Sequence, residues 1–174
     1  MTDQDTRPDK RPLTPLAGPY GHPFHAIAVT IPIGAWIASL VFDILGLLAA
    51  DPAPYAIGSR VLIGIGLVGS VAAIFFGILD YLRIPDRTRS SSTATIHMGL
   101  NFLICGAYLF QFFLRTMTDE IPVAGVIFSV VSLLILSASG WLGGKLAYRY
   151  GVRVAHETKQ AEGFTVRGET SRRP

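Results

Sequence analysis

The sequence has few charged residues, and those few are unevenly distributed. Asp, Glu, Lys and Arg make up 16% of the 174 residues, whereas a soluble domain carries about 25%. Most of them lie near the two termini and in one central loop, and 50% of the chain is hydrophobic. This composition excludes an ordinary soluble domain and predicts a small membrane protein with several spans.

Cysteine and nucleotide-binding motifs are also scarce. The single cysteine, Cys105, excludes an internal disulfide. The run GIGLVG (64–69) lies inside an apolar stretch with no strand before it, so we interpret it as a helix-packing motif. No Ser–His–Asp arrangement and no nucleic-acid-binding pattern is evident. We therefore assign no catalytic residue and expect no nucleic-acid partner.

Long apolar runs are abundant, and they do not alternate with polar residues, which excludes strands and predicts helices. A helix needs about 20 residues to cross a bilayer. The runs that reach this length cover residues 26–50, 56–82, 94–114 and 121–148. We therefore predict an all-α fold, a four-transmembrane-helix bundle at 21–154, with disordered polar tails at 1–20 and 155–174.

Lys and Arg are strongly biased to one side of the predicted bundle. The two tails, the end of the last span and the loop after the second span contain 13 of the 15, and the other side has only Arg60 and Arg115. Cytoplasmic loops of membrane proteins carry the excess of basic residues. We therefore expect both termini in the cytoplasm.

Proline and hydroxyl residues predict local features of the helices. Pro23 suits the first turn of a helix, which predicts a cap at Gly21 or His22. Pro32 lacks an N–H and crowds the carbonyl of Ala28, so it is expected to bend the first helix. The run SSSTA is expected to cap the third helix through a hydroxyl.

Polar residues recur on one face of the first and third predicted helices. These faces contain His25, Pro32, Trp36, Ser39 and Asp43 on the first helix, and His97, Asn101, Cys105, Tyr108 and Arg115 on the third. Intervals of three, four and seven residues keep side chains on one side of a helix. A face of small residues on the second helix ends at Asp80, and small residues allow helices to approach closely. We expect these faces to point into the bundle.

The predicted topology brings polar residues from all four helices to the cytoplasmic side. The candidate site residues are His22, His25, Asp80, His97, Asn101 and Arg149. Placing a polar side chain within a membrane costs free energy, and such residues are often functional. Asp43 is near the outer end of the first helix, and we expect it to reach water.

Several motifs, taken in order, resemble a known family. GHPFHAIAVTIPIG, FDILG, GILDYLR, HMGLN and SGWLGGKLAYRYGV resemble bacterial membrane proteins grouped as domain of unknown function 2231, over residues 21–154. The resemblance implies a four-helix domain in the bacterial inner membrane and supplies no activity. The family's characteristic positions would be His22, Pro23, Pro32, Asp43, Asp80, His97, Asn101, Gly143, Gly144, Tyr148, Arg149 and Gly151. Lys145 replaces the acidic residue or histidine common in the family, which argues against a metal ligand there.

Three functional interpretations remain open. The one that we favour from the sequence is a structural, accessory or interaction role, in which the polar residues form a hydrogen-bonded network beside a membrane-protein partner or a second copy of the chain. The second is a haem b or metal site with His25 or His22 opposite His97, and with Asp80 orienting a ligand. No histidine lies on the outer side, so at most one haem fits. The third is a conduit for protons or small solutes.

Overall fold

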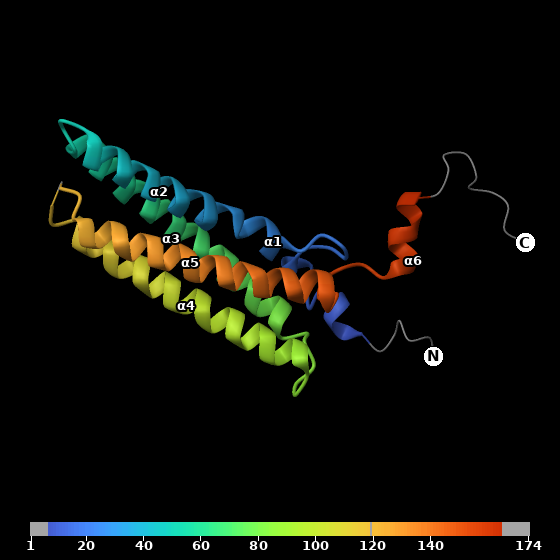
Figure 1. Cartoon of the computed structure of the whole chain (residues 1–174). Coiled ribbons are helices and arrows are strands. Elements are labelled where there is room, and N and C mark those ends of the chain that lie inside the picture. Colours follow the sequence, from blue (N-terminus) through green and yellow to red (C-terminus); the bar gives the residue numbers. More distant parts are fainter. Residues whose placement is uncertain (1–6, 119, 165–174) are drawn as a thin grey trace, which may run out of the picture.

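The computed structural model describes residues 7–118 and 120–164, and it is helical within these ranges apart from the connecting segments. Figure 1 shows four long helices, which are α2 (Thr30–Leu48), α3 (Ala53–Tyr81), α4 (Arg89–Arg115) and α5 (Val123–Gly144). The shorter elements are η2 (Pro8–Lys10), η3 (Pro15–Ala17), α1 (Phe24–Ala28), the π-helical turn η4 (Lys145–Arg149), α6 (Glu157–Gln160) and η5 (Ala161–Phe164). No strand occurs in the described ranges, so the predicted all-α fold is confirmed.

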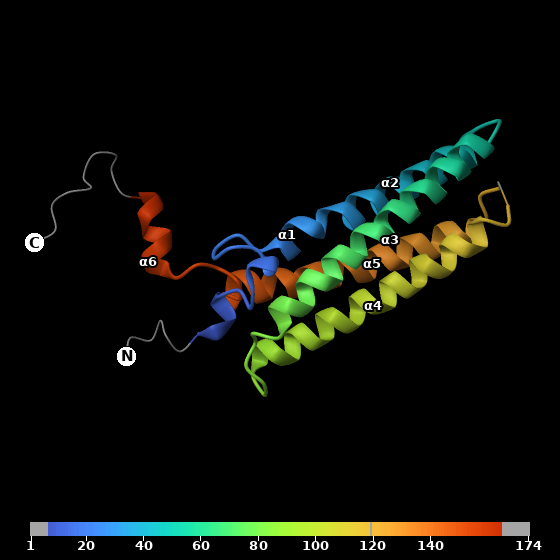
Figure 2. The same cartoon turned by 180° about the vertical axis from the view of Figure 1, so that it is seen from behind.

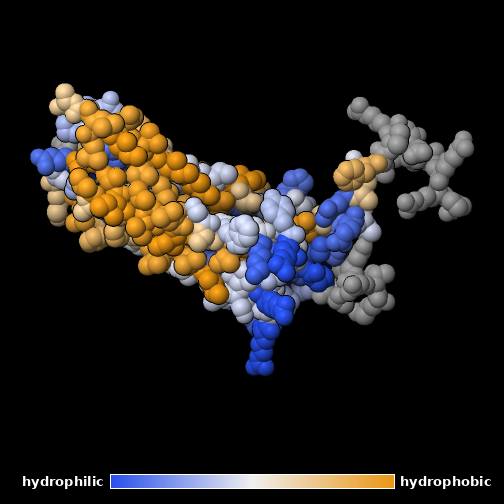
Figure 3. Space-filling view, viewed as in Figure 1, coloured by the Kyte–Doolittle hydropathy of each residue, from blue (hydrophilic) through white to orange (hydrophobic). Residues whose placement is uncertain are grey.

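Four helical segments are long and apolar enough to cross a membrane. They are Phe24–Leu48, Ala53–Tyr81, Arg89–Arg115 and Val123–Arg149, and all lie close to the predicted spans. On the face shown in Figure 3, hydrophobic side chains cover most of the length of the bundle, and hydrophilic ones gather at the end that carries α6. A surface of this kind suits lipid contact, because a soluble protein would not leave so large an apolar area exposed.

The long helices form two antiparallel hairpins, α2–α3 and α4–α5, which pack against each other (Figures 1 and 2). Helix α3 contacts α4, and α2 contacts α5. The segment 7–20, the loop 82–88 and α6 lie at one end of the bundle, which we call the terminal end. The connection 49–52 and the described residues 116–118 and 120–122 lie at the other, which we call the distal end.

Helix boundaries differ from the prediction where capping chemistry intervenes. Helix α4 begins at Arg89, five residues before the predicted start, because the Thr88 side chain accepts a hydrogen bond of 3.0 Å from the Ser91 N–H. The first helix begins at Phe24 after Pro23 instead of being capped by Gly21 or His22. The predicted irregularity near Pro32 is present as a break at Val29 between α1 and α2.

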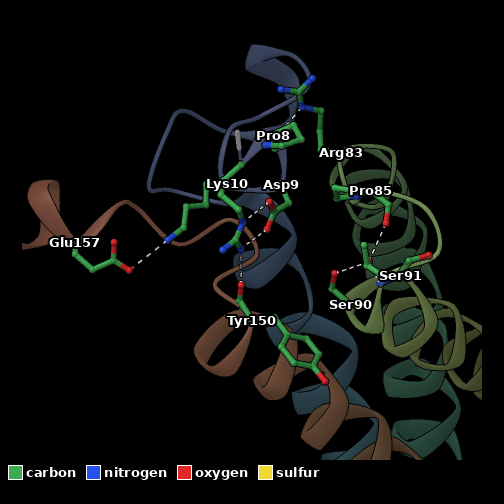
Figure 4. Close-up of polar contacts among 11 residues, drawn as sticks. Pro8, Asp9, Lys10, Arg83, Pro85, Ser90, Ser91, Tyr150 and Glu157 are labelled. Atoms are coloured by element: carbon green, nitrogen blue, oxygen red, sulfur yellow. Dashed lines mark hydrogen bonds and ion pairs between the residues drawn. The ribbon is translucent and has the colours of Figure 1, made fainter. Parts of the chain in front are cut away.

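The N-terminal segment is ordered where the structure describes it, in contrast to the predicted disordered tail at 1–20. Arg7 makes two hydrogen bonds to Asp9, of 2.9 and 2.7 Å, and a third to the Tyr150 carbonyl. Asp9 and Lys10 are buried, and Lys10 lies 3.7 Å from Glu157 (Figure 4). Composition alone does not predict this packing, because Tyr150 and Glu157, which contact Arg7 and Lys10, lie more than 100 residues away. The remainder of both predicted tails, 1–6 and 165–174, lies outside the described residues.

The middle of the bundle is packed around Trp36, which stacks on Tyr108 with ring centroids 4.2 Å apart and an interplanar angle of 9°. Ile63 and Ile104 complete this buried cluster. Gly66 on α3 lies against the indole of Trp36, so a Cβ at this position would collide with the ring. The small-residue face of α3 therefore makes room for a large aromatic side chain, as the sequence predicted for close helix packing.

We expect Gly66→Ala to lower the free energy of unfolding by about 1–3 kcal/mol, because the added methyl group overpacks the site against Trp36. Thermal unfolding in detergent measures the change. Gly99→Ala is the matched control, since a Cβ there meets no atom within 4 Å, and alanine favours helix by up to about 1 kcal/mol. Equal stability of the two variants would refute this account of the packing.

Candidate functional site

The side chain of His25 enters the bundle from α1 and is oriented by the neighbouring helix α3. Its Nδ1 lies 2.8 Å from the carbonyl oxygen of Ala73. A carbonyl can only accept, so Nδ1 carries a proton, and Nε2 of the neutral ring keeps its lone pair. Gly77 lies one turn further along α3, where a Cβ would be 3.0 Å from Nδ1. The ring is therefore held in one orientation with one nitrogen available for a ligand.

His97 on α4 is held in the same way by α5. Its Nδ1 lies 2.8 Å from the carbonyl oxygen of Ser139 and 3.0 Å from the Ser139 hydroxyl. A Cβ at Gly143 would be 3.2 Å from Cε1 of the ring. The Asn101 amide donates to the Ser139 hydroxyl at 2.7 Å and lies 3.3 Å from His97 Nε2. In the neutral ring this Nε2 is again the unprotonated nitrogen, and it accepts from the Asn101 amide.

The two hairpins thus build the site by a repeated design. In each half of the bundle, the first span supplies a histidine (His25 on α1, His97 on α4), and the next span supplies a carbonyl that binds Nδ1 and a glycine beside the ring. The two imidazoles are neighbours in an edge-to-face arrangement, with ring centroids 6.3 Å apart and planes at 87°. The predicted meeting of His25 and His97 inside the bundle therefore agrees with the structure.

A cavity of about 420 Å³ adjoins both histidines between the four helices. Its wall is mostly apolar, with Trp36 on one side and Asp80 and Arg153 among the residues that line it. Cofactor sites are commonly apolar pockets of about 300–1,000 Å³ with a few placed polar groups. The site therefore combines oriented imidazoles with space for a ligand.

Arg149, which was predicted to belong to the same polar network as Asp80, is not the arginine that pairs with it. Arg149 is exposed on η4, and Asp80 instead forms an ion pair with the buried Arg153, with Arg153 Nε 2.7 Å from Asp80 Oδ1. Helical periodicity could not predict this pairing, because the chain turns back after η4 through Gly151 and Arg153, both with positive φ. His22 is also exposed, and its Nδ1 lies 3.3 Å from the Tyr20 carbonyl oxygen. His25, Asp80, His97 and Asn101 line the cavity.

A second buried polar cluster lies near the distal end and was not part of the predicted site. Arg115 makes a two-pronged ion pair with Asp43, at 2.6 and 2.7 Å, and neither side chain reaches solvent appreciably. The hydroxyl of Ser59 and the side-chain oxygen of Gln111 accept further hydrogen bonds from Arg115. The expectation that Asp43 reaches water was wrong, because α4 supplies a charge partner within the bundle.

The sequence did contain a signal for this cluster. Asp43 and Arg115 are 72 residues apart, and the same interval separates His25 from His97 and Trp36 from Tyr108. The first and third spans run in the same direction, so a constant interval keeps successive residues of the two faces opposite each other. One contact between these faces would therefore have predicted the other two.

These features define a four-helix integral membrane protein with a histidine pair beside a partly open cavity. Residues 21–156 match the family described as predicted membrane protein, domain of unknown function 2231, and the chain belongs to that family. No curated protein and no solved structure matches the chain. The resemblance seen in the sequence motifs is thereby confirmed.

Proposed function

We propose that the protein binds a single haem b, which His25 and His97 would hold by binding its iron through their imidazoles. The observation that carries this proposal is the orientation of the two imidazoles, each with Nδ1 bound to a carbonyl, so that Nε2 of the neutral ring has a lone pair for a metal. At His97 the metal would replace the Asn101 amide as the partner of Nε2. Metal-binding histidines commonly donate their other ring nitrogen to a carbonyl or carboxylate in this way. A purely structural histidine has no need of such an arrangement on both sides of a cavity.

The spacing of the rings supports a shared metal. With metal–nitrogen bonds of about 2.0–2.1 Å and ring centres about 1.1 Å behind the nitrogen, two imidazoles on opposite sides of one metal have centroids about 6.3 Å apart. The observed value is 6.3 Å. The rings can be perpendicular, because rotation about the metal–nitrogen bond does not change this distance.

The number of protein ligands favours haem over a bare metal ion. Within residues 7–118 and 120–164, no group of three or more His, Cys, Asp or Glu side chains could hold a metal. Zinc takes three or four protein ligands, whereas haem receives four nitrogens from its porphyrin and needs only axial ligands from the protein. The apolar wall of the cavity also suits a porphyrin.

The chemistry that haem supplies when bound is one-electron transfer. The residues of this chain would hold and orient it: the carbonyls of Ala73 and Ser139 fix the imidazoles, and Gly77 and Gly143 leave room beside them. One such site near one surface suits electron exchange with a membrane-protein partner on that side. A structural role or a conduit for protons or solutes remains the alternative if no haem binds.

We expect the purified protein in detergent to bind one haem per chain. A haem titration should shift the Soret band and, after reduction, give sharp α and β bands. Zn²⁺ added instead of haem should not bind tightly, because the site offers only two imidazoles. A spectrum identical to that of free haem would refute the proposal and favour a structural role for the histidines.

The proposed orientation places the terminal end in the cytoplasm and the protein in the bacterial inner membrane. The bias of Lys and Arg toward that end supports it. We expect alkaline phosphatase, which is active only outside the cytoplasm, to be inactive when fused after Pro174 and active when inserted after Met117 in the distal loop. The reverse pattern would contradict the proposed orientation.

A further inference from the structure

The terminal end of the cavity contains an arginine whose bonding is incomplete. Arg153 is only 3% exposed, and its backbone has a φ of 60°, which is uncommon for a residue with a side chain. Its backbone N–H donates to the Asp9 carbonyl at 2.9 Å. A residue keeps this backbone conformation only when the surrounding structure holds it there, and such residues are concentrated at functional sites.

The guanidinium group of Arg153 has N–H donors that make no hydrogen bond to the described residues. Nη2 donates to the carbonyls of Ala17 and Gly18 at 2.8 and 3.1 Å. Nε faces Asp80 Oδ1 at 2.7 Å, as an ion pair that lacks the angle of a hydrogen bond. Nη1 is buried and finds no hydrogen-bond partner among the residues that the structure describes. Leaving a buried charged donor unpaired is costly, which indicates that a ligand completes its bonding.

We infer that Arg153 binds a carboxylate of the ligand in the cavity, which for the proposed haem is a propionate. Arg153 and Asp80 line the same cavity as His25 and His97. Asp80 lies three residues beyond Gly77, which contacts the His25 ring, so it is about 4.5 Å further along α3 towards the terminal end. A planar guanidinium group suits recognition of a carboxylate. Arg153 is a binding residue in this inference, which rests on the proposed function.

The charge balance at this end permits a second carboxylate. Arg153 would bridge two carboxylates, with Asp80 at Nε and the ligand at Nη1. The like charges of the two carboxylates oppose each other, and the guanidinium group between them offsets this repulsion. The N-terminal segment contributes the carbonyls of Ala17 and Gly18, which hold Arg153 in place.

The test compares haem with its dimethyl ester, which keeps the porphyrin and iron and lacks both carboxylates. Full-length protein in detergent is titrated with each, and affinity is read from the Soret shift. We expect the ester to bind at least about tenfold more weakly than haem, as loss of a charge-assisted hydrogen bond predicts. Equal affinities would overturn the inference while leaving the histidine site intact. If neither compound binds, the proposed function itself fails, and this inference with it.

Variants locate the effect on one side chain. Arg153→Gln should weaken haem at least about tenfold and leave the affinity for the ester unchanged. Arg149→Gln is the matched control, because it removes the same charge from an exposed position four residues earlier. An equal loss of both compounds in Arg153→Gln would contradict a carboxylate contact. Should this variant fail to fold, the comparison of the two compounds on the unaltered protein still decides the matter.

Discussion

Replacing Arg115 by methionine is expected to lower the free energy of unfolding by about 3–5 kcal/mol, because the substitution leaves the carboxylate of Asp43 buried without its partner. Asp43 is 0% exposed, and both of its oxygens accept hydrogen bonds from Arg115. Ser59 and Gln111 lose a donor at the same time. Thermal unfolding in detergent, followed by circular dichroism, measures the loss.

The double variant Asp43→Leu/Arg115→Met separates charge pairing from packing. It removes both charges together, and an apolar replacement of a buried ion pair is often neutral or even stabilising. We therefore expect it to recover most of the stability lost in Arg115→Met. Arg89→Met is the control on the same helix, at an exposed position, with an expected change within about 0.5 kcal/mol. A double variant as unstable as the single one would refute pairing as the source of the effect.

Replacing His97 by alanine is expected to abolish the spectrum of the two-ligand haem and to weaken haem binding by about 100-fold or more, since loss even of groups that orient a ligand costs about 10–100-fold. His25→Ala should do the same, because the two hairpins supply equivalent ligands. The Soret band and the reduced α band, recorded after equal haem loading, measure both effects. His22→Ala is the control, since His22 is exposed outside the cavity.

The alternative outcome for His97 is equally specific. If the histidines are structural, the unaltered protein takes up no haem, and His97→Ala lowers stability by about 1–3 kcal/mol through the unpaired Ser139 and Asn101 groups. A haem spectrum that survives His97→Ala would rule out the proposed ligand set. Size-exclusion chromatography of each variant distinguishes loss of a ligand from loss of folding.

The sequence by itself determined the four spans and the composition of their polar faces. A continuous apolar run that crosses the bilayer forms a helix, because its backbone N–H and C=O groups must hydrogen-bond to one another within the segment. Helical periodicity then places His25, Trp36 and Asp43 on one face, and His97, Tyr108 and Arg115 on another. These statements are local, since they follow from residues within one helix.

Only the tertiary structure decided which groups meet. The register between the first span, formed by α1 and α2, and helix α4 places His25 opposite His97 and Asp43 opposite Arg115. The packing of each span against the next selects the carbonyl that orients each imidazole. The pairing of Asp80 with Arg153 arises where the chain reverses after η4. Contacts of this kind depend on how the helices are placed relative to one another and on where the chain reverses. Helical periodicity describes the faces of a single helix, so it cannot predict them.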